Sequence, residues 1–199
     1  MLSIIRRVIY LLRYTLLYKI QFGFFDIKAT IINPLSIDCP KNIFIGKAYV
    51  GKMTWLAAVP LTSEKECKLV IKDGCLIGHF NHIYATGKIV IENDVLTADK
   101  VYISDNLHRY DDIEKPIHKQ PIKQNGHVTI GEGSWLGENV CVLGVSIGKH
   151  CVVGANSVVT HNIPDYSVAI GSPAFVIKRY NFDTQKWQKT DKYGNFIEQ

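Results

Sequence analysis

The chain has 199 residues, 47% of them hydrophobic and 21% charged, which is typical of a single domain with a full hydrophobic core. Its formal charge of +5 is modest and its basic residues are spread out except near the N-terminus, so we expect no nucleic-acid partner. The five cysteines form no C-x-x-C pair, which favours reduced thiols and a cytoplasmic location.

Residues 1–23 are expected to form an amphipathic helix, with its regular part over residues 3–20. Apolar residues recur at helical spacing from Ile5 to Leu16, opposite Arg6, Arg7 and Arg13. The basic residues argue against a membrane span, and no cleavage site of a signal peptide follows. Two uses of the apolar face stay open. It packs on protein, or it lies on the inner face of a membrane as a peripheral contact.

Between residues 24 and 103, aliphatic side chains return at intervals of six residues, with occasional steps of eight. The spacing is ragged at first, through Ile31, Ile37 and Ile45, as expected for terminal repeats. Residues 60–68 are expected to form an exposed excursion. The spacing then becomes regular, with the repeating positions occupied by Ile71, Ile77, Ile83, Ile91, Thr97 and Ile103.

Residues 104–127 interrupt this period with a polar segment that contains Asp105, His108, Arg109 and Tyr110. Loops longer than about 12 to 15 residues are usually functional or disordered. Because this loop carries side chains suited to acid–base chemistry, we expect it to be functional.

The period resumes over residues 128–159, where the repeating positions are Ile130, Leu136, Val142, Ile147, Val153 and Val159. A period of six fits neither a helix nor an ordinary strand, and three such hexads close one triangular coil. Four positions after an inward residue, smaller side chains are expected to fill a corner, namely Ser134, Val140, Cys151 and Ser157. One residue is missing between Val142 and Ile147, which predicts a local kink.

These hexads resemble those of the hexapeptide-repeat acyltransferases, whose all-β fold is a left-handed parallel β-helix. The resemblance implies a β-helix over residues 24–163, interrupted by the loop 104–127, and a C-terminal cap and tail over residues 164–199. It also implies a homotrimer whose active sites lie between neighbouring subunits.

The segment ISDNLHRYDD, residues 103–112, resembles the catalytic region of galactoside and xenobiotic acetyltransferases, in which a histidine stands where a coil gives way to a loop. The resemblance implies that His108 is the catalytic base. An acceptor hydroxyl is a poor nucleophile at neutral pH, and an imidazole can take its proton during attack. The segment is also similar to the D-H-x-H-x-Y-x-D pattern of acetyltransferases in polysaccharide synthesis, with Asn106 replacing the first histidine.

Histidines on this fold can also bind zinc, since the related γ-class carbonic anhydrases bind a zinc ion through three of them. His79 and His82 lack a third ligand at a defined spacing, so we expect no metal. We expect His79, Asn81, His82 and Asp105 to contact the acceptor instead.

The cofactor side of the resemblance begins at residues 135–138, which match the W-I-G-x turn beside the pantetheine channel. It implies that the backbone N–H of Glu138 stabilises the oxyanion. The implied coenzyme A contacts are Trp135, Gly137, Ala155, Thr160, His161, Gly171, Pro173, Lys178 and Arg179. Family members commonly have a lysine in place of His161 and a basic residue in place of Phe175.

The resemblance therefore implies a bacterial O-acetyltransferase that uses acetyl-CoA as co-substrate and a small-molecule or oligosaccharide acceptor, in surface polysaccharide synthesis. N-acetylation of an amino sugar or a xenobiotic is the alternative within enzymes. A non-catalytic or zinc-binding β-helix is the alternative of another class.

Overall fold

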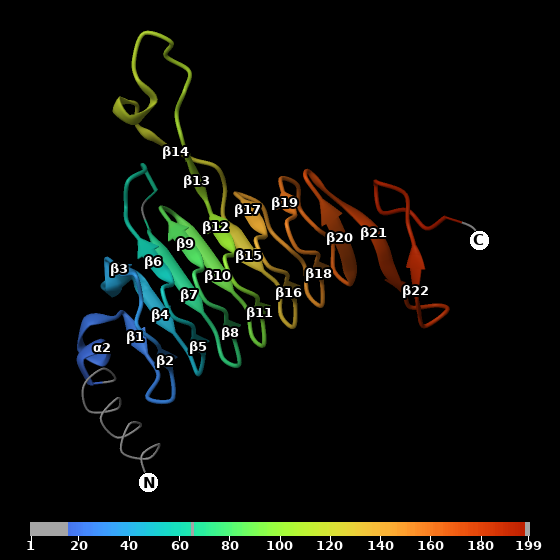
Figure 1. Ribbon diagram of the computed structural model, residues 1–199, viewed down its shortest axis with the longest axis horizontal. Coiled ribbons are helices and arrows are strands. Elements are labelled where there is room, and N and C mark those ends of the chain that lie inside the picture. Colours follow the sequence, from blue (N-terminus) through green and yellow to red (C-terminus); the bar gives the residue numbers. More distant parts are fainter. Residues whose placement is uncertain (1–15, 65, 198–199) are drawn as a thin grey trace.

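The computed structural model describes residues 16–64 and 66–197, which wind into a triangular β-helix (Figure 1). The chain passes from one face of this prism to the next in a fixed order, which we call faces A, B and C. All strand pairs within the coil are parallel. The expected left-handed parallel β-helix is confirmed. In the described part of the chain, no helix has the length and apolar character needed to cross a membrane.

Each face is one parallel sheet. Face A consists of β1 (Phe24–Phe25), β4 (Ile43–Ile45), β7 (Lys68–Ile71), β10 (Lys88–Ile91) and β15 (Val128–Ile130). Face B consists of β2 (Thr30–Ile31), β5 (Tyr49–Val50), β8 (Leu76–Ile77), β11 (Leu96–Thr97), β16 (Trp135–Leu136), β18 (Val152–Val153) and β20 (Ser167–Gly171). Face C consists of β3 (Ser36–Asp38), β6 (Trp55–Ala58), β9 (His82–Ala85), β12 (Tyr102–Ser104), β17 (Cys141–Leu143) and β19 (Val158–Val159).

The core is the stack of inward residues that the six-residue period predicts. On face C, for example, Ile103 pairs in register with Ile83 and Val142, and all three are fully buried. The four corner residues Ser134, Val140, Cys151 and Ser157 are buried as well. Stacking like residues on like residues turns one short hexad into a continuous hydrophobic column.

The corners between faces B and C are tight because each contains one residue in the left-handed region. These residues have φ between 40° and 60° and are Asn33, Met53, Phe80, Lys100, Asn139 and Asn156. Asparagine accepts this conformation readily, whereas larger side chains are disfavoured there. A shared corner conformation keeps the coils in register even where the sequence at the corner varies.

The ragged first coils pair as regularly as the later ones, since β1 continues into β4 and β7 in one ladder. The short 3₁₀ helix η2 (Pro40–Asn42) takes up the extra residues of the eight-residue step. The expected kink after Val142 is also present. Face A continues beyond β15 only as isolated bridges at Ile147 and Ile163, and Gly144 has φ of 66°.

The segment 104–127 is an ordered arm and not the loop we expected. Strands β13 (Asn106–His108) and β14 (Ile122–Gln124) form an antiparallel hairpin that projects away from the coil (Figure 1). The helix η3 (Ile117–Lys119) lies just before β14. There, Gln120 donates hydrogen bonds to the carbonyl oxygens of Asp112 and Lys115. Short polar strands held by local pairing carry no hexad signal, which is why the sequence pattern missed them.

The expected cap and tail also form more structure than predicted. Strand β20 still belongs to face B, and β21 (Ala174–Asn181) and β22 (Lys186–Lys189) extend that sheet antiparallel. At the other end, α2 (Leu16–Gln21) covers only the last part of the expected helix, and Tyr18 packs on Phe22 and Phe25. The expectation for residues 1–15 lies outside the described residues.

Candidate active site

His108 lies on the arm, where the chain leaves the edge between faces C and A. It ends strand β13 opposite Ile122, and its side chain is exposed. Within residues 16–64 and 66–197 the imidazole makes no hydrogen bond. An exposed imidazole without a partner is free to reach a substrate hydroxyl.

The base of the arm is held by the carboxylate of Asp105, which is 0% exposed. This carboxylate accepts hydrogen bonds from the backbone N–H groups of Thr86 and Gly87, both at 2.8 Å. It also accepts from the Thr86 hydroxyl and from the amide of Asn106, each at 3.1 Å. Asp105 is therefore a structural anchor, and the expectation that it contacts the acceptor is wrong, because its oxygens are buried and engaged.

Gln124 closes the base of the arm from its second strand. Its Nε2 donates to the carbonyl oxygens of Asp105 at 3.0 Å and Gly126 at 2.8 Å. Its Oε1 accepts from the hydroxyls of Thr86 at 2.9 Å and Thr62 at 3.1 Å. The sequence pattern did not single out Gln124. Together, Asp105 and Gln124 tie the arm to the corner of the neighbouring coil and to the excursion 60–68.

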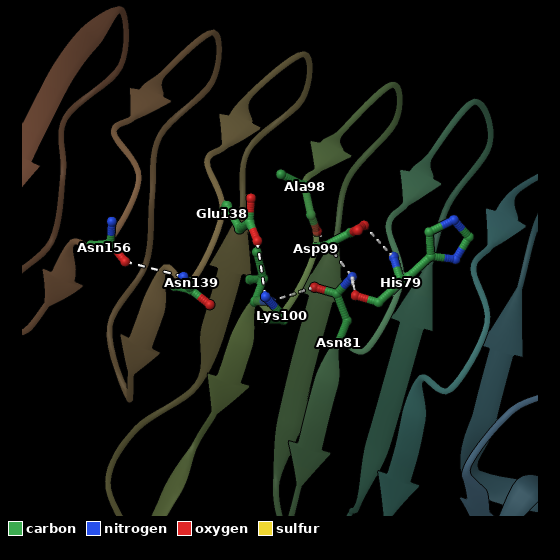
Figure 2. A network of polar contacts seen from close by, with 9 residues as sticks. His79, Asn81, Ala98, Asp99, Lys100, Glu138, Asn139 and Asn156 are labelled. Atoms are coloured by element: carbon green, nitrogen blue, oxygen red, sulfur yellow. Dashed lines mark hydrogen bonds and ion pairs between the residues drawn. The ribbon is translucent and has the colours of Figure 1, made fainter.

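Glu138 lies on a different edge, the corner between faces B and C (Figure 2). Two coils earlier along this corner, the N–H of His79 donates to the carboxylate of Asp99, the residue one coil before Glu138, at 2.7 Å. The N–H of Glu138 has no such acceptor among the described residues. Its side chain instead faces Lys100, with Oε1 and Nζ 3.1 Å apart. A free backbone donor at an exposed corner is suited to an oxyanion.

Asn81 is buried in the same corner, so the expectation that it contacts the acceptor is also wrong. Its Oδ1 accepts from the N–H of Val101 at 2.9 Å, and its Nδ2 donates to the carbonyl of Ala98 at 3.1 Å (Figure 2). Asn81 stands four positions after the inward Ile77. The rule that places Ser134 and Cys151 in corners therefore contained the signal for Asn81.

His79 and His82 do not lie together. His79 is at the corner, where its Nδ1 accepts from the N–H of Lys52 at 2.8 Å. His82 is on the outside of face C, stacked on Trp55 with ring centroids 4.2 Å apart. Burial lowers the pKa of His82, and its Nε2 is buried without a hydrogen-bond partner. No group of three or more His, Cys, Asp or Glu side chains among the residues described is arranged to hold a metal ion.

Three of the expected coenzyme contacts form a column along the corner between faces B and C. Gly137 directly follows β16, Ala155 lies two residues after β18, and Gly171 is the last residue of β20; these three strands pair in register. A Cβ atom on Gly137 would lie 2.7 Å from the backbone nitrogen of Ala155, so only glycine fits there. Pro173 follows Gly171 at the same end of face B, and Trp135, 48% exposed, lies on the outside of that face.

Two further expected contacts lie across face C, at its edge with face A. The hydroxyl of Thr160 is 3.0 Å from Nδ1 of His161. His161 lines a pocket of about 290 Å³ together with Phe175, Lys192 and Tyr193. The last two residues were not predicted, because the tail that brings them there has no hexad pattern.

Lys178 and Arg179 lie apart from both groups. Strand β21 runs back along β20, so that Arg179 pairs with Ser167 at the edge between faces A and B. Gly171 lies at the opposite end of β20 and pairs with Ala174. Arg179 therefore lies across face B from the corner column, because the antiparallel turn carries it there, and its expected contact with coenzyme A stays a prediction.

The three buried cysteines are not suited to act as nucleophiles. Burial raises the pKa of Cys75 and Cys151 to about 11 and that of Cys67 to about 12. These thiols stay protonated near neutral pH and pack in the core.

A single chain does not bring His108 and Glu138 together. They stand on the two edges that bound face C, since β12 and β17 pair in register between them. At about 3.3 Å per strand residue, these edges are about 15 Å apart. In one chain, the imidazole of His108 and the backbone N–H of Glu138 therefore face solvent on different edges of the coil.

Comparison with known proteins identifies the repeat. A family described as "Hexapeptide repeat of succinyl-transferase" matches residues 127–161. The chain is 38% identical to a putative lipopolysaccharide biosynthesis O-acetyl transferase of Escherichia coli, WbbJ, over 61% of this chain. The match covers 65% of that relative, so the chain spans less than two thirds of its length.

Two further proteins match most of the chain. A putative acetyltransferase of Saccharomyces cerevisiae is 35% identical over 83% of this chain and 76% of its own length. Among solved structures, an N-acyltransferase from Bacillus cereus, AntD, aligns with a TM-score of 0.68 over 84% of this chain and 88% of the other. Its sequence identity is 20%, so this likeness concerns the fold alone.

Proposed function

The chain belongs to the hexapeptide-repeat acetyltransferases, and we propose that it transfers the acetyl group of acetyl-CoA to a hydroxyl of a saccharide. Membership rests on the repeat and on the relative matched over 76% of its length. The saccharide acceptor is supported by the named lipopolysaccharide role of the Escherichia coli relative. The single observation that carries the proposal is the exposed imidazole of His108, which has no hydrogen-bond partner among the described residues and is presented by an anchored arm.

In the proposed reaction, the unprotonated ring nitrogen of His108 takes the proton of the acceptor hydroxyl. The hydroxyl oxygen attacks the carbonyl carbon of the thioester, and the N–H of Glu138 donates to the resulting oxyanion. The carbon–sulfur bond then breaks, and the leaving thiolate receives the proton from His108. General base catalysis of this kind contributes about 10²- to 10⁴-fold, and one oxyanion donor about 10²- to 10³-fold.

We place this reaction between subunits of a homotrimer, because the two groups occupy opposite edges of face C. Three copies around an axis, each with face C inward, place the arm edge of one copy beside the Glu138 corner of the next. In that arrangement His108 of one subunit and the Gly137–Ala155–Gly171 column of its neighbour border one groove.

Exposed apolar side chains support this arrangement. Near its far end the arm exposes Tyr110, Ile113 and Ile117, with Ile113 92% exposed. The outside of face B exposes Leu76, Leu96 and Trp135, which lie in neighbouring coils. Exposed apolar patches often mark interaction sites. An arm that crosses to the neighbouring subunit covers both patches at once.

Acetyl-CoA and activated sugars are cytoplasmic metabolites, so we propose that the enzyme works in the cytoplasm. The apolar face predicted for residues 3–20 then has two uses, contact with another part of the protein or attachment to the inner face of the membrane. Leu17 and Ile20 at the end of this segment are exposed.

The test measures release of free thiol from acetyl-CoA in the presence of nucleotide sugars, oligosaccharides and matched amino sugars. Thiol release with a hydroxyl-bearing sugar, and a product that alkaline hydroxylamine deacetylates, is the expected result. An acetyl product that resists hydroxylamine and forms only with amino sugars would establish N-acetylation instead. His108→Ala is the negative control for every acceptor.

A further inference from the structure

A second pocket lies at the C-terminal end of the coil, on the edge between faces A and B. It has a volume of about 410 Å³, within the range of about 300–1,000 Å³ of small-molecule sites. We call it the C-terminal pocket. Its lining residues are Asp165, Tyr166, Arg179, Tyr180, Asn181, Phe182, Asp183 and Phe196. None of them belongs to the edges that carry His108 and Glu138.

Aromatic rings form the walls of this pocket. Phe182 meets Tyr166 edge-to-face with centroids 4.9 Å apart, and Tyr180 at 5.1 Å. His150 stacks on Tyr166 and holds it from the preceding coil. Phe182 is nevertheless 62% exposed, so much of its ring is open to a ligand. An aromatic ring that is fixed by its neighbours and partly exposed can bind the C–H face of a pyranose, because polarised C–H groups pack on the negative face of the ring.

Polar groups with unused bonding capacity line the same space. The Nε atom of Arg179 is buried and has no hydrogen-bond partner among the residues that the structure describes, an uncommon state for a guanidinium. Its Nη1 makes one long contact with the carbonyl of Gly194, at 3.5 Å. The carboxylate of Asp165 accepts from the N–H of Lys149 through Oδ1, which leaves Oδ2 without a donor in the described part of the chain. A ligand that both donates and accepts hydrogen bonds satisfies both residues.

The charges of the lining decide between classes of ligand. Asp165 and Asp183 bring two negative charges and Arg179 one positive charge to the lining, and the ammonium of Lys149 lies 5.4 Å from the ring centroid of Tyr166. This near-neutral balance gives a phosphate or nucleotide no net attraction, whereas neutral hydroxyl groups pair with both the carboxylates and the guanidinium. Aromatic walls with this mixture of donors and acceptors are suited to an uncharged sugar.

We propose that the C-terminal pocket binds a neutral saccharide, at a site separate from the site of acetyl transfer. The ligand class follows from the pocket itself. Only its purpose, to hold a distant part of an acceptor chain, rests on the proposed function. With face C turned toward the axis of a trimer, the edge between faces A and B is outermost and open to a polymer.

The experiment is saturation-transfer NMR on the full chain, without acetyl-CoA, using maltotriose and the methyl glycosides of glucose, galactose and mannose as probes. At least one probe should bind. Phe182→Ala and Arg179→Gln should each weaken that binding by about tenfold. Phe175→Ala is the matched control, since it removes an exposed phenylalanine that lies in β21 and lines a different pocket, and it should leave binding unchanged.

Two further measurements distinguish this proposal from the proposed function. His108→Ala should bind the same probe with unchanged affinity, so an inactive enzyme with an intact pocket remains measurable. Uridine diphosphate should not compete with the probe. Absence of binding to every probe, binding that survives Phe182→Ala, or competition by the diphosphate would each overturn the proposal.

Discussion

Ile103 and His108 are five residues apart, yet one lies in the buried core of the coil and the other on an exposed arm. Ile103 is held by like residues above and below it, Ile83 and Val142. His108 is held at a distance, through the hydrogen bonds that Asp105 and Gln124 make at the base of the arm. The coil therefore depends on apolar burial and the arm on a few buried polar contacts. Stability and catalysis are expected to respond to different substitutions.

The largest expected effect is on stability, from Ile103→Ala. Truncation of a fully buried isoleucine leaves a cavity and should cost about 2–5 kcal/mol of the free energy of unfolding. Chemical denaturation measures it. Val90→Ala is the control, because Val90 points outward on face A, and it should cost much less. Equal losses in the two variants would mean that the inward ladder is not the main source of stability.

His108→Ala should show the reverse behaviour. We expect turnover to fall at least about 10²-fold, with little change in the melting temperature, because the side chain is exposed and has no partner in the described structure. Acetyl transfer to the best acceptor and thermal unfolding are measured on the same preparation. Turnover close to that of the wild type would move the role of base to another group, with His79 the first candidate.

Asp105→Asn should affect both properties, because Asp105 connects the coil to the arm. The new amide group faces the N–H donors of Thr86 and Gly87 and leaves at least one of them unsatisfied, at a cost of about 1–3 kcal/mol. We expect turnover to fall about tenfold as the base of the arm loosens. Asp112→Asn makes the same change near the far end of the arm, where Asp112 pairs with Lys115, and should leave stability nearly unchanged. Equal losses of stability and turnover in the two variants would show that Asp105 does not anchor the arm to the coil.

The pH dependence of stability should include a contribution from face C. Burial holds the pKa of His82 below its ordinary value, with a smaller opposing influence from Asp38. The unfolded state therefore binds the proton more readily, and stability is lost as the pH falls through about 6.5. His82→Phe keeps a ring against Trp55 and removes the titrating group. Its melting temperature should fall less between pH 7.5 and 5.5 than that of the wild type, and an identical fall would exclude the effect.

The smallest expected effect concerns residues 3–20, which precede the coil. If their basic face attaches to a membrane, intact protein should sediment with anionic vesicles at low salt, with about 1 kcal/mol from each arginine. Replacing Arg6, Arg7 and Arg13 together by glutamine should abolish this binding and leave Tyr18 packed on the coil. No difference between the two proteins would favour packing on protein.

The parts of the fold that repeat were predictable from the sequence, and the parts that break the repeat were not. The inward column and the corner residues follow from the period of six, and so does the kink after Val142. The strands of the arm were not predicted, because their pairing depends on buried polar contacts such as that of Asp105, which no periodicity reveals. Asn81 was misassigned although the corner rule covered it, because an asparagine beside two histidines suggested binding. The position of Arg179 across face B could not be predicted, because the reversal of β21 is a tertiary feature.

The most direct test of the account is complementation between two inactive subunits. His108→Ala removes the base, and Ala155→Trp is designed to block the channel beside Gly137 while leaving His108 intact. The two variants carry different tags, are produced together and are purified through both tags. If each site joins His108 of one subunit to the column of its neighbour, mixed trimers should recover about a third of wild-type activity, since every trimer that carries both tags has one complete interface among its three. Mixed oligomers as inactive as the parent variants would contradict an active site built between subunits.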